Sequence, residues 1–266
     1  QNPNLYSWNL MLRAYAHNGD IHNAQALFDL TPHPDVYTWN ILMKAYIKEA
    51  CLDDARRVFN TMPCHNVVSW TAMIAGYVHD VDHICEGFIL FQKMLLDGVI
   101  LPNSFTFLNV TNACTKLGDI QAGRMIHASV IEYGLDVNPY SVNALINMYV
   151  KCGAFHKGEE VFQGLLDKDI GSFHPLLARY AQEGQTEDAL KCFESMRSQC
   201  IYWDAFTLSC ILRACTIEGA PELGEVIEVE IRKRGLLQKD TVLGATLVDM
   251  YAKCGLLDKA QGVFEQ

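Results

Sequence analysis

Apolar residues recur along the chain at helical spacing, in pairs of stripes. Successive apolar positions in a stripe lie three or four residues apart, so each stripe predicts one amphipathic helix. A short turn separates the two stripes, usually with a glycine that suits the left-handed backbone at a helix end. A single pair of helices cannot bury both stripes, so neighbouring pairs are expected to stack. In residues 36–66 the stripes are Ile41, Leu42, Ala45 and Tyr46, then Ala55, Val58, Phe59 and Met62, and the turn glycines of the chain include Gly19, Gly118, Gly153, Gly184 and Gly255.

The pairs of stripes repeat along the chain with related amino-acid sequences. Each first stripe opens with Ser or Thr and an aromatic residue, often followed by Asn or Thr, and most second stripes end in Ala-x-x-(Leu/Val)-Phe or a close variant. Self-similarity at such a period is typical of solenoids. The chain is therefore predicted to be all-α, a single array of about eight helix-turn-helix repeats over residues 1–266. The predicted repeats are 5–35, 36–66, 67–103, 104–138, 139–169, 170–204, 205–240 and a truncated 241–266.

Composition and charge narrow the class of protein. Half of the 266 residues are hydrophobic and 20% are charged, which is typical of a folded protein. The formal net charge of −10 argues against indiscriminate nucleic-acid binding through a basic surface, although one polar or basic face on an acidic body is compatible with it. No apolar run is long enough to span a membrane. The chain lacks an initiator Met and a targeting peptide, so we expect it to be a segment of a longer protein.

Motifs for catalysis or metal binding are not found. The sequence has no phosphate-binding glycine loop, Ser-His-Asp order or paired-carboxylate nuclease motif, so we expect no enzyme and no small-molecule substrate. Its ten cysteines include no C-x-x-C pair and are expected to be reduced, buried residues. His79, His83 and Cys85 are spaced as metal ligands could be, but a solvated turn is the favoured interpretation, so neither a metal nor a cofactor is predicted.

The sequence motifs of the repeats resemble those of a known family. The motifs are VVSWTAMIAGY at 67–77, NALINMYVKCG at 143–153 and TLVDMYAKCG at 246–255, with repeat lengths of 31, 35 and 36. Tetratricopeptide repeats keep a period of about 34 residues and a different pattern. The chain resembles pentatricopeptide repeat (PPR) proteins, specifically the plant class whose P, L and S repeats differ in length. This resemblance implies a right-handed superhelix.

The resemblance also implies a function. Such a protein would bind single-stranded RNA sequence-specifically in a mitochondrion or chloroplast, with the mitochondrion favoured, and would specify a site for C-to-U editing. The alternative is a protein-interaction scaffold that binds helper proteins such as the multiple organellar RNA editing factors. Many proteins of the class end in a deaminase-like domain, which needs H-x-E and C-x-x-C. Neither motif occurs here, so any catalytic domain is expected to lie outside this chain.

Base reading is predicted at two positions per repeat. The fifth residue of a repeat and the residue that closes it would together read the edge of one base. A closing Asp or Asn is equally explained as a helix N-cap. The resemblance implies a site of the form U-Y-A-n-U-n-G, in which Leu108 and His174 leave the two unassigned bases. The predicted pairs are Asn9 with Asp35, Asn40 with Asn66, Thr71 with Asn103, Asn143 with Asp169, His174 with Asp204, and Ser209 with Asp240.

Two further sets of residues are predicted to contact RNA. The second residue of each repeat would stack on bases, although burial in the core is a strong alternative for apolar residues at a regular period. Lysines at the end of each first helix would meet phosphates, or would only offset a helix dipole, which is typically worth about 0.3–1 kcal/mol. Acidic residues are expected in the first turn of second helices, away from the RNA. The stacking set is Tyr6, Tyr37, Val68, Phe105, Tyr140 and Phe206; the phosphate set is Lys48, Lys116, Lys151 and Lys253; the acidic set is Asp53, Asp54, Glu159, Glu160, Glu187, Asp188 and Asp258.

Overall fold

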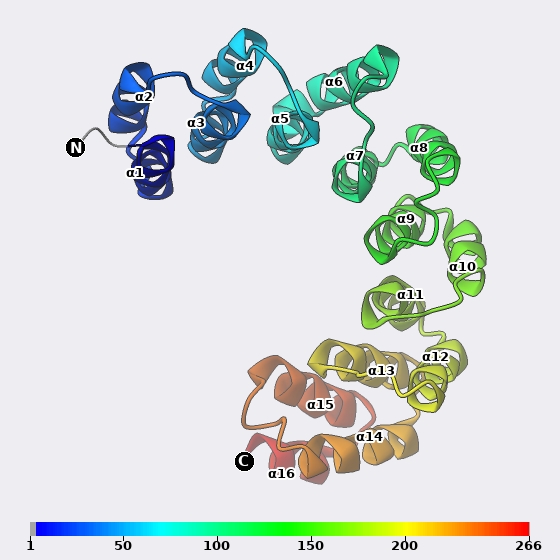
Figure 1. The fold of residues 1–266 in the computed structure, drawn as a ribbon. Helices are drawn as coiled ribbons and strands as arrows, with labels where there is room; N and C mark the ends of the chain where they lie inside the picture. The colour runs from blue at the N-terminus through cyan, green and yellow to red at the C-terminus, as the bar shows by residue number, and fades with distance from the viewer. Residues whose placement is uncertain (1–3, 266) are drawn as a thin grey trace. The chain divides into compact units, whose positions relative to one another are not determined.

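The computed structural model describes residues 4–265, which form sixteen α-helices and one short 3-10 helix (Figure 1). No strand occurs within these residues. The helices alternate between the first and second member of a hairpin, so the prediction of an all-helical repeat fold is confirmed. The first helices are α1 (Leu5–His17), α3 (Val36–Lys48), α5 (Val67–His79), α7 (Ser104–Leu117), α9 (Pro139–Lys151), α11 (Ile170–Glu183), α13 (Ala205–Glu218) and α15 (Thr241–Lys253).

The second helices complete the hairpins. They are α2 (Ile21–Leu30), α4 (Leu52–Thr61), α6 (Ile84–Asp97), α8 (Ile120–Glu132), α10 (Phe155–Gln163), α12 (Thr186–Ser198), α14 (Pro221–Lys233) and α16 (Leu257–Phe264), and the 3-10 helix η1 (Val81–His83) precedes α6.

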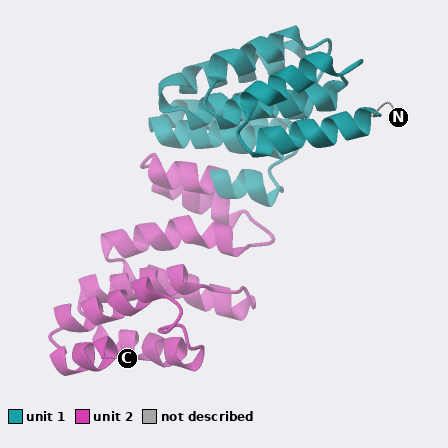
Figure 2. Cartoon of the chain, turned by 90° about the vertical axis from the view of Figure 1, so that its left-hand side faces the viewer, with its two compact units in different colours: residues 1–144 teal, residues 145–266 magenta. Residues whose placement is uncertain are grey.

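The chain forms two compact units, residues 1–144 and 145–266, with the division inside α9 (Figure 2). In the first unit, α1, α3, α5 and α7 pack on one another in a row, and each second helix packs on its own first helix. In the second unit, α11, α13 and α15 form the corresponding row, with α12, α14 and α16 behind them. Each unit therefore consists of a layer of first helices and a layer of second helices.

The apolar stripes form the core that was predicted for them. In the second hairpin Leu42, Ala45, Ala55 and Phe59 are at most 3% exposed. Tyr46 is half-buried, and its hydroxyl donates a hydrogen bond to Gln25 Oε1 of the preceding hairpin at 2.7 Å.

An aromatic contact between consecutive hairpins explains the two ends of the repeat motif. The Phe near the end of one second helix meets the aromatic fourth residue of the next repeat, edge to face, which adds about 0.5–1.5 kcal/mol beyond the buried area. The pairs and ring-centroid distances are Phe28–Trp39 at 4.6 Å, Phe59–Trp70 at 5.1 Å, Phe91–Phe107 at 5.6 Å and Phe162–Phe173 at 4.8 Å.

Two more tyrosines of first helices tie their hairpins to the preceding one in the same way as Tyr46. The hydroxyl of Tyr180 on α11 donates to Glu159 Oε1 on α10 at 2.6 Å, and Tyr251 on α15 makes the same contact with Glu228 on α14. Burial and the neighbouring carboxylate raise the pKa of both phenols.

The turn between the helices of a hairpin adopts the left-handed backbone that was predicted. Gly153 has a φ of 80°, and a side chain there would meet no atom within 4 Å, so the backbone angle alone favours glycine. The second hairpin places Ala50 at the equivalent turn with a φ of 58°. A Cβ atom in this conformation costs roughly 1–2 kcal/mol.

The cysteines are only partly as expected. Cys114, Cys210 and Cys215 are buried, and Cys152 and Cys254 are half-buried. The prediction of burial is wrong for Cys51, Cys64, Cys85 and Cys200, which are exposed because they lie in or beside turns. None of the helices in residues 4–265 combines the length and the apolar character that crossing a membrane requires.

Candidate functional site

The residues that close the repeats are helix N-caps. Asp35 Oδ1 accepts a hydrogen bond from the backbone N–H of Thr38 at 2.8 Å, and Asp204 Oδ1 accepts one from Thr207 at 2.9 Å. The capping interpretation is therefore confirmed. A carboxylate or amide has a second polar atom, so capping through Oδ1 leaves Oδ2 or Nδ2 for another role. All of the closing residues cap through Oδ1: Asp35, Asn66, Asn103, Asn138, Asp169, Asp204 and Asp240.

The structure brings several of the predicted reading pairs together. Asn40 Nδ2 lies 3.4 Å from Asn66 Oδ1, and His174 Nε2 lies 3.3 Å from Asp204 Oδ1. Each pair joins the first helix of one repeat to the N-cap of the next, which is the geometry that reading one base with both residues requires.

Two more pairs are joined through a threonine hydroxyl of the following helix. Thr38 Oγ1 lies 2.8 Å from Asn9 Oδ1 and 2.7 Å from Asp35 Oδ1. Thr106 Oγ1 lies 2.7 Å from Thr71 Oγ1 and 3.1 Å from Asn103 Oδ1.

Hydrogen bonds set the charge state of two of these caps. Partial burial raises the pKa of Asp35, but the backbone and hydroxyl of Thr38, with Asn9 and the backbone of Tyr37, outweigh it and lower the pKa overall. Partial burial likewise raises the pKa of Asp204, and the bonds from Thr207 and the proximity of His174 reverse the shift. Both carboxylates are therefore acceptors at neutral pH.

The remaining predicted readers lie on first helices or at their N-caps. Asn143 is half-buried on α9, and Asp169 caps α11 with Oδ1 at 2.9 Å from the backbone nitrogen of Ser172. Ser209 is half-buried on α13, and no hydrogen bond joins it to Asp240 in the part of the chain that the structure describes. The base-reading role of these residues stays a prediction.

The second residues of the repeats are on the surface, so the core alternative is wrong for them. A helix turns about 100° per residue, which points residues two apart to opposite sides. Tyr37 is therefore 53% exposed, while Trp39 packs on Phe28. The exposed fractions are 75% for Tyr6, 53% for Tyr37, 43% for Val68, 52% for Phe105, 58% for Tyr140, 46% for Phe206 and 68% for Val242.

A cleft of about 270 Å³ lies between two of these aromatic residues. Tyr6 and Tyr37 line it together with the reading pair Asn9 and Asp35, and Arg13 completes the wall. The cleft thus presents two aromatic rings, an amide, a carboxylate and a guanidinium to one occupant.

The predicted phosphate-binding lysines occupy the ends of first helices, where two of them contact backbone. Lys48 Nζ donates to the carbonyl of His17 at 2.6 Å, and Lys116 Nζ donates to the carbonyl of Val78 at 2.9 Å. Each lysine therefore offsets the dipole of the preceding first helix. Lys253 pairs with Asp249 at 2.8 Å, and Lys151 is exposed.

Sequence reasoning missed a second set of cations. Arg13, Lys44 and Arg213 are exposed and follow Asn9, Asn40 and Ser209 by four residues. Residues four apart share one face of a helix, so these cations lie beside the reading residues. The spacing of four residues from each reading residue is the sequence pattern that predicts these cations.

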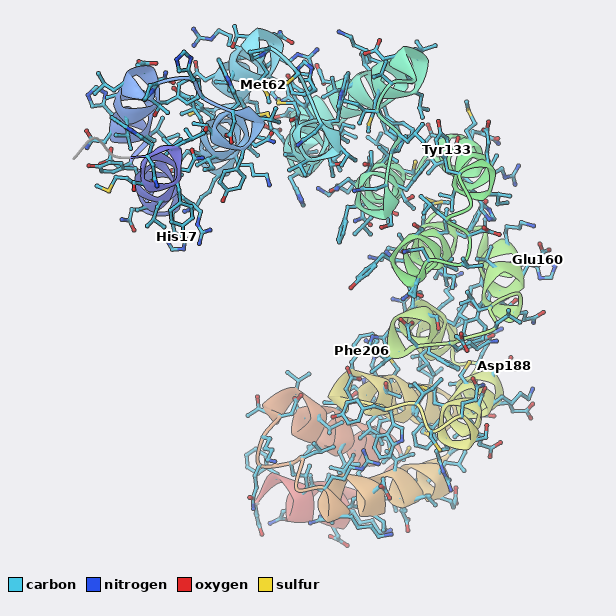
Figure 3. The ribbon with its side chains drawn as sticks, viewed as in Figure 1. His17, Met62, Tyr133, Glu160, Asp188 and Phe206 are labelled. Carbon is cyan, nitrogen blue, oxygen red and sulfur yellow. The ribbon has the colours of Figure 1, made fainter. Side chains whose placement is uncertain are left out.

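The acidic residues are mainly on second helices. Figure 3 labels Phe206 on the first-helix side of the second unit, and Glu160 and Asp188 on the second-helix side. Asp53, Asp54, Glu187, Asp188 and Asp258 lie in the first turn as predicted. The prediction is wrong for Glu159 and Glu160, because α10 begins at Phe155 and places them in its second turn. Within residues 4–265, His79, His83 and Cys85 do not form a group that could hold a metal ion.

The comparisons with known proteins agree with this geometry. The sequence model of the PPR repeat family matches residues 6–30, 37–67, 140–170, 172–201 and 246–266, together just over half of the chain. A chloroplastic pentatricopeptide repeat-containing protein of Arabidopsis thaliana is 36% identical over 180 residues, which are 68% of this chain and 22% of that protein. A second chloroplastic one is 32% identical over 181 residues, 68% of this chain and 30% of that protein.

This chain thus spans less than a third of the length of those relatives. The crystal structure of the pentatricopeptide repeat protein PPR10 from maize shares the fold, with a TM-score of 0.68 and 20% identity over 98% of this chain and 39% of PPR10. Because the family model covers more than half of its residues, the chain belongs to the PPR repeat family.

Proposed function

We propose that this protein binds single-stranded RNA sequence-specifically, with one base read at each junction between consecutive repeats. The observation that carries the proposal is the cleft between Tyr6 and Tyr37, because it combines the two components of single-strand recognition. Aromatic rings stack on the face of a base, and polar side chains read its edge. The other second residues repeat this exposed apolar surface along the array.

The first cleft suits uracil. The Watson–Crick edge of uracil has carbonyl acceptors and an N–H donor. Asn9 Nδ2 can donate to a carbonyl, and the ionised Asp35 can accept the N–H through the oxygen that does not cap the helix. The chemistry therefore supports U at this junction, as the resemblance to PPR proteins implies. The proposed site reads U-Y-A-n-U-n-G from 5′ to 3′.

Backbone attraction in this interface is weak. The chain has a net charge of −10, and we place its useful positive charge at Arg13, Lys44 and Arg213. We therefore expect specificity to come from base contacts, with a modest dependence of affinity on salt.

The test exchanges one reading pair for another that the chain already contains. Asn9→Thr with Asp35→Asn reproduces the pair Thr71 and Asn103, and both junctions have Thr at the third position of the following repeat. We expect the base preferred at the first junction to change from U to A, measured by binding to four RNAs that differ only there. Preferences at the third junction serve as the control. Equal, weak binding to matched and scrambled RNA would refute the proposal.

The finer assignment follows from the resemblance. We propose that the chain is part of a P-L-S-type plant protein, that it acts in an organelle, and that the bound site marks a cytidine for C-to-U editing by a catalytic domain outside this chain. Relatives named as chloroplastic support an organellar location. Editing of a reporter transcript that carries the matched site, in plants with and without the intact gene, tests this assignment.

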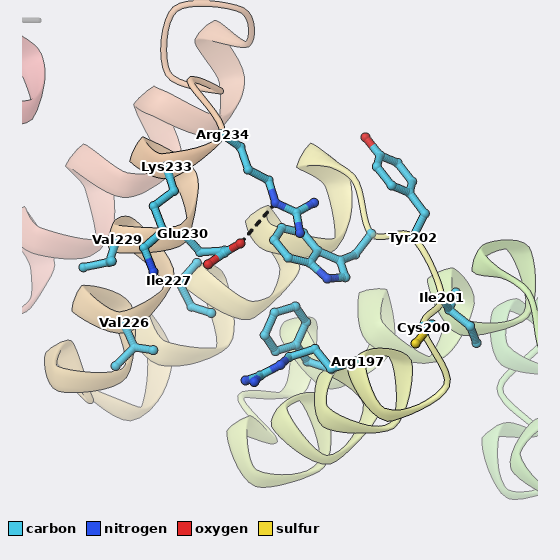
Figure 4. Close-up of a pocket in the computed structure, with 12 residues that line it drawn as sticks. Arg197, Cys200, Ile201, Tyr202, Val226, Ile227, Val229, Glu230, Lys233 and Arg234 are labelled. Atoms are coloured by element: carbon cyan, nitrogen blue, oxygen red, sulfur yellow. Dashed lines mark hydrogen bonds and ion pairs between the residues drawn. The ribbon is translucent and has the colours of Figure 1, made fainter.

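A groove between α12 and α14 favours a second function, the binding of a helper protein (Figure 4). It measures about 820 Å³ and is flanked by the exposed Val226, Val229 and Tyr202. The Arg234 guanidinium lies 3.3 Å from the ring centre of the buried Trp203. Arg197 and Lys233 add positive charge to the lining of a groove in an otherwise acidic chain.

We propose that an acidic segment with apolar side chains, from a protein of the multiple organellar RNA editing factor class, occupies this groove. The groove belongs to the second-helix layer, so RNA on the first helices of the same unit would not compete for it. Arg197→Glu with Lys233→Glu should abolish binding of a purified factor in calorimetry and leave RNA affinity unchanged. Undiminished binding of the factor by this variant would contradict the assignment.

A further inference from the structure

We propose that Thr38, Thr106 and Thr207 are positioning residues for base reading, each of which fixes the polar atoms that the reading side chain of the preceding repeat presents. The inference rests on the proposed function and extends it to the third residue of the repeat. That residue lies between the exposed stacking residue and the buried aromatic one.

A hydroxyl is buried at this position in six consecutive junctions. Burying a hydroxyl is unfavourable unless it is hydrogen-bonded, so a buried hydroxyl at six of the seven junctions needs an explanation. Capping explains part of it, because five of the six hydroxyls also bond the closing residue, and only the Ser141 hydroxyl has no hydrogen-bond partner among the described atoms. The six residues are Thr38, Ser69, Thr106, Ser141, Ser172 and Thr207, each at most 1% exposed.

At the first junction the hydroxyl orients an amide. Thr38 Oγ1 lies 2.8 Å from Asn9 Oδ1 and 2.7 Å from Asp35 Oδ1. Both of these oxygens only accept, so they share the single Thr38 proton, and the Asn9 amide turns its Oδ1 towards Thr38. Nδ2 is then the Asn9 atom that remains as a donor to an occupant of the cleft.

The other two threonines act on different reading groups. Thr106 Oγ1 donates to Asn103 Oδ1 at 3.1 Å, and the Thr71 hydroxyl at 2.7 Å then donates to Thr106 and keeps its lone pairs for a donor such as the adenine amino group. Thr207 Oγ1 lies 3.1 Å from Asp204 Oδ1 and 3.5 Å from His174 Nε2.

Ser69, the serine at this position of the second junction, serves the cap alone. Ser69 Oγ donates to Asn66 Oδ1 at 3.1 Å and accepts from the Asn66 backbone at 3.3 Å. Asn40 Oδ1 is buried there without a hydrogen-bond partner among the described atoms. The γ-methyl group of threonine restricts its χ1 angle, so its hydroxyl has fewer directions available than that of serine, which lacks this restraint. The Asn40 amide is therefore less constrained, in keeping with its assignment to C or U.

The experiment removes one hydroxyl and adds a methyl group elsewhere. Thr38→Val keeps the shape of the side chain, Thr38→Ser keeps the hydroxyl, and Ser69→Thr supplies the restraint that the second junction lacks. RNA binding by the whole chain is measured with base substitutions at the first, second and third junctions. Nuclear magnetic resonance follows hydrogen exchange of the Asn9 Nδ2 protons without RNA.

We expect Thr38→Val to reduce discrimination at the first base by roughly three- to tenfold, the range for one hydrogen bond, and to leave the third base unaffected. Thr38→Ser should retain part of the discrimination, and Ser69→Thr should increase the preference at the second base. Exchange at Asn9 should accelerate in Thr38→Val.

Unchanged discrimination in Thr38→Val, with normal discrimination by the unmodified protein, would overturn the inference and leave the proposed function intact. Absence of discrimination by the unmodified protein would instead refute the proposed function. In that case hydrogen exchange of the Asn9 amide in Thr38→Val tests separately whether the Thr38 hydroxyl holds the amide. Unchanged exchange would show that it does not.

Discussion

Lys48, the last residue of α3, donates a hydrogen bond of 2.6 Å to the backbone carbonyl of His17, the last residue of α1. The lysine of one repeat therefore supports the carboxyl end of the first helix in the repeat before it. We expect Lys48→Met to lower the free energy of unfolding by about 0.3–1 kcal/mol, because the dipole of α1 loses its cation. Urea denaturation measures this.

The control for Lys48 is Lys44→Met on the same helix, which should change stability by less than about 0.5 kcal/mol. A variant of Lys48 that kept its stability but lost salt-dependent RNA binding would show that the lysine serves phosphate and not the helix end.

Arg13 is expected to be the phosphate contact of the first junction. Arg13→Gln should weaken RNA binding and reduce the slope of log affinity against log salt by about 0.7, the value for one contact on a single strand. The free energy of unfolding should not change, since the side chain is exposed. Lys93→Gln, an exposed cation on the second helix α6, is the matched control, and an equal effect of the two variants would argue against a specific contact.

Ala50 offers a way to stabilise the array. Its φ of 58° strains an alanine but not a glycine, and Gly153 shows the residue that the turn prefers. Ala50→Gly should raise the free energy of unfolding by about 0.5–1 kcal/mol, after the entropy that glycine loses on folding. Gly153→Ala should have the opposite sign. If thermal unfolding shows Ala50→Gly to be destabilising, the turn owes its conformation to its surroundings.

Tyr180 is expected to make the free energy of unfolding depend on pH above pH 10. Its pKa in the folded protein is raised above the ordinary value of 10.0, so the folded state favours the neutral phenol. The stability that this contributes is complete below pH 10 and is lost as the pH rises from there towards the raised value. Tyr180→Phe should therefore cost about 1–2 kcal/mol at pH 8, and its difference from the unmodified protein should shrink by pH 11.

Chemical denaturation at both pH values tests the tyrosine prediction. Tyr6→Phe, at a phenol that is 75% exposed, is the control for removing a surface hydroxyl and should change the free energy of unfolding at pH 8 by less than about 0.5 kcal/mol. A constant difference for Tyr180→Phe would mean that its phenol ionises as readily in the folded state as in the unfolded one.

The helical hairpins and their order follow from sequence because each apolar stripe and turn is a local signal. Which of two aromatic residues faces the core is harder to decide when both recur at the period of the repeat. Tyr37 and Trp39 differ in exposure because Phe28, which belongs to another repeat, packs on Trp39. Only the packing of neighbouring hairpins distinguishes them.

The burial of the Thr38 hydroxyl can be predicted from the sequence. Thr38 precedes Ile41 and Leu42 by three and four residues, which places it on the buried stripe of its helix. The hydrogen bond of Lys48 could not be predicted from the sequence. Its acceptor is the backbone carbonyl of a residue 31 positions earlier, and every residue has such a carbonyl, so no residue type marks the partner. The partners of a repeat lie in its neighbour, and spacing within one repeat does not show them.

Each reading site joins Asn9, Asp35 and Thr38 from the two sides of a repeat boundary. A recombination breakpoint placed in the turn between the two helices of a hairpin, such as the turn at Gly19, separates Asn9 from Asp35 and Thr38. A breakpoint at the boundary itself creates a chimaeric site with one parent's amide and the other's hydroxyl. Designers who assemble arrays from interchangeable parts should therefore cut at the fourth residue of a repeat, such as Trp39, because the first site then ends with Thr38 on one fragment and the next site begins with Asn40 on the other.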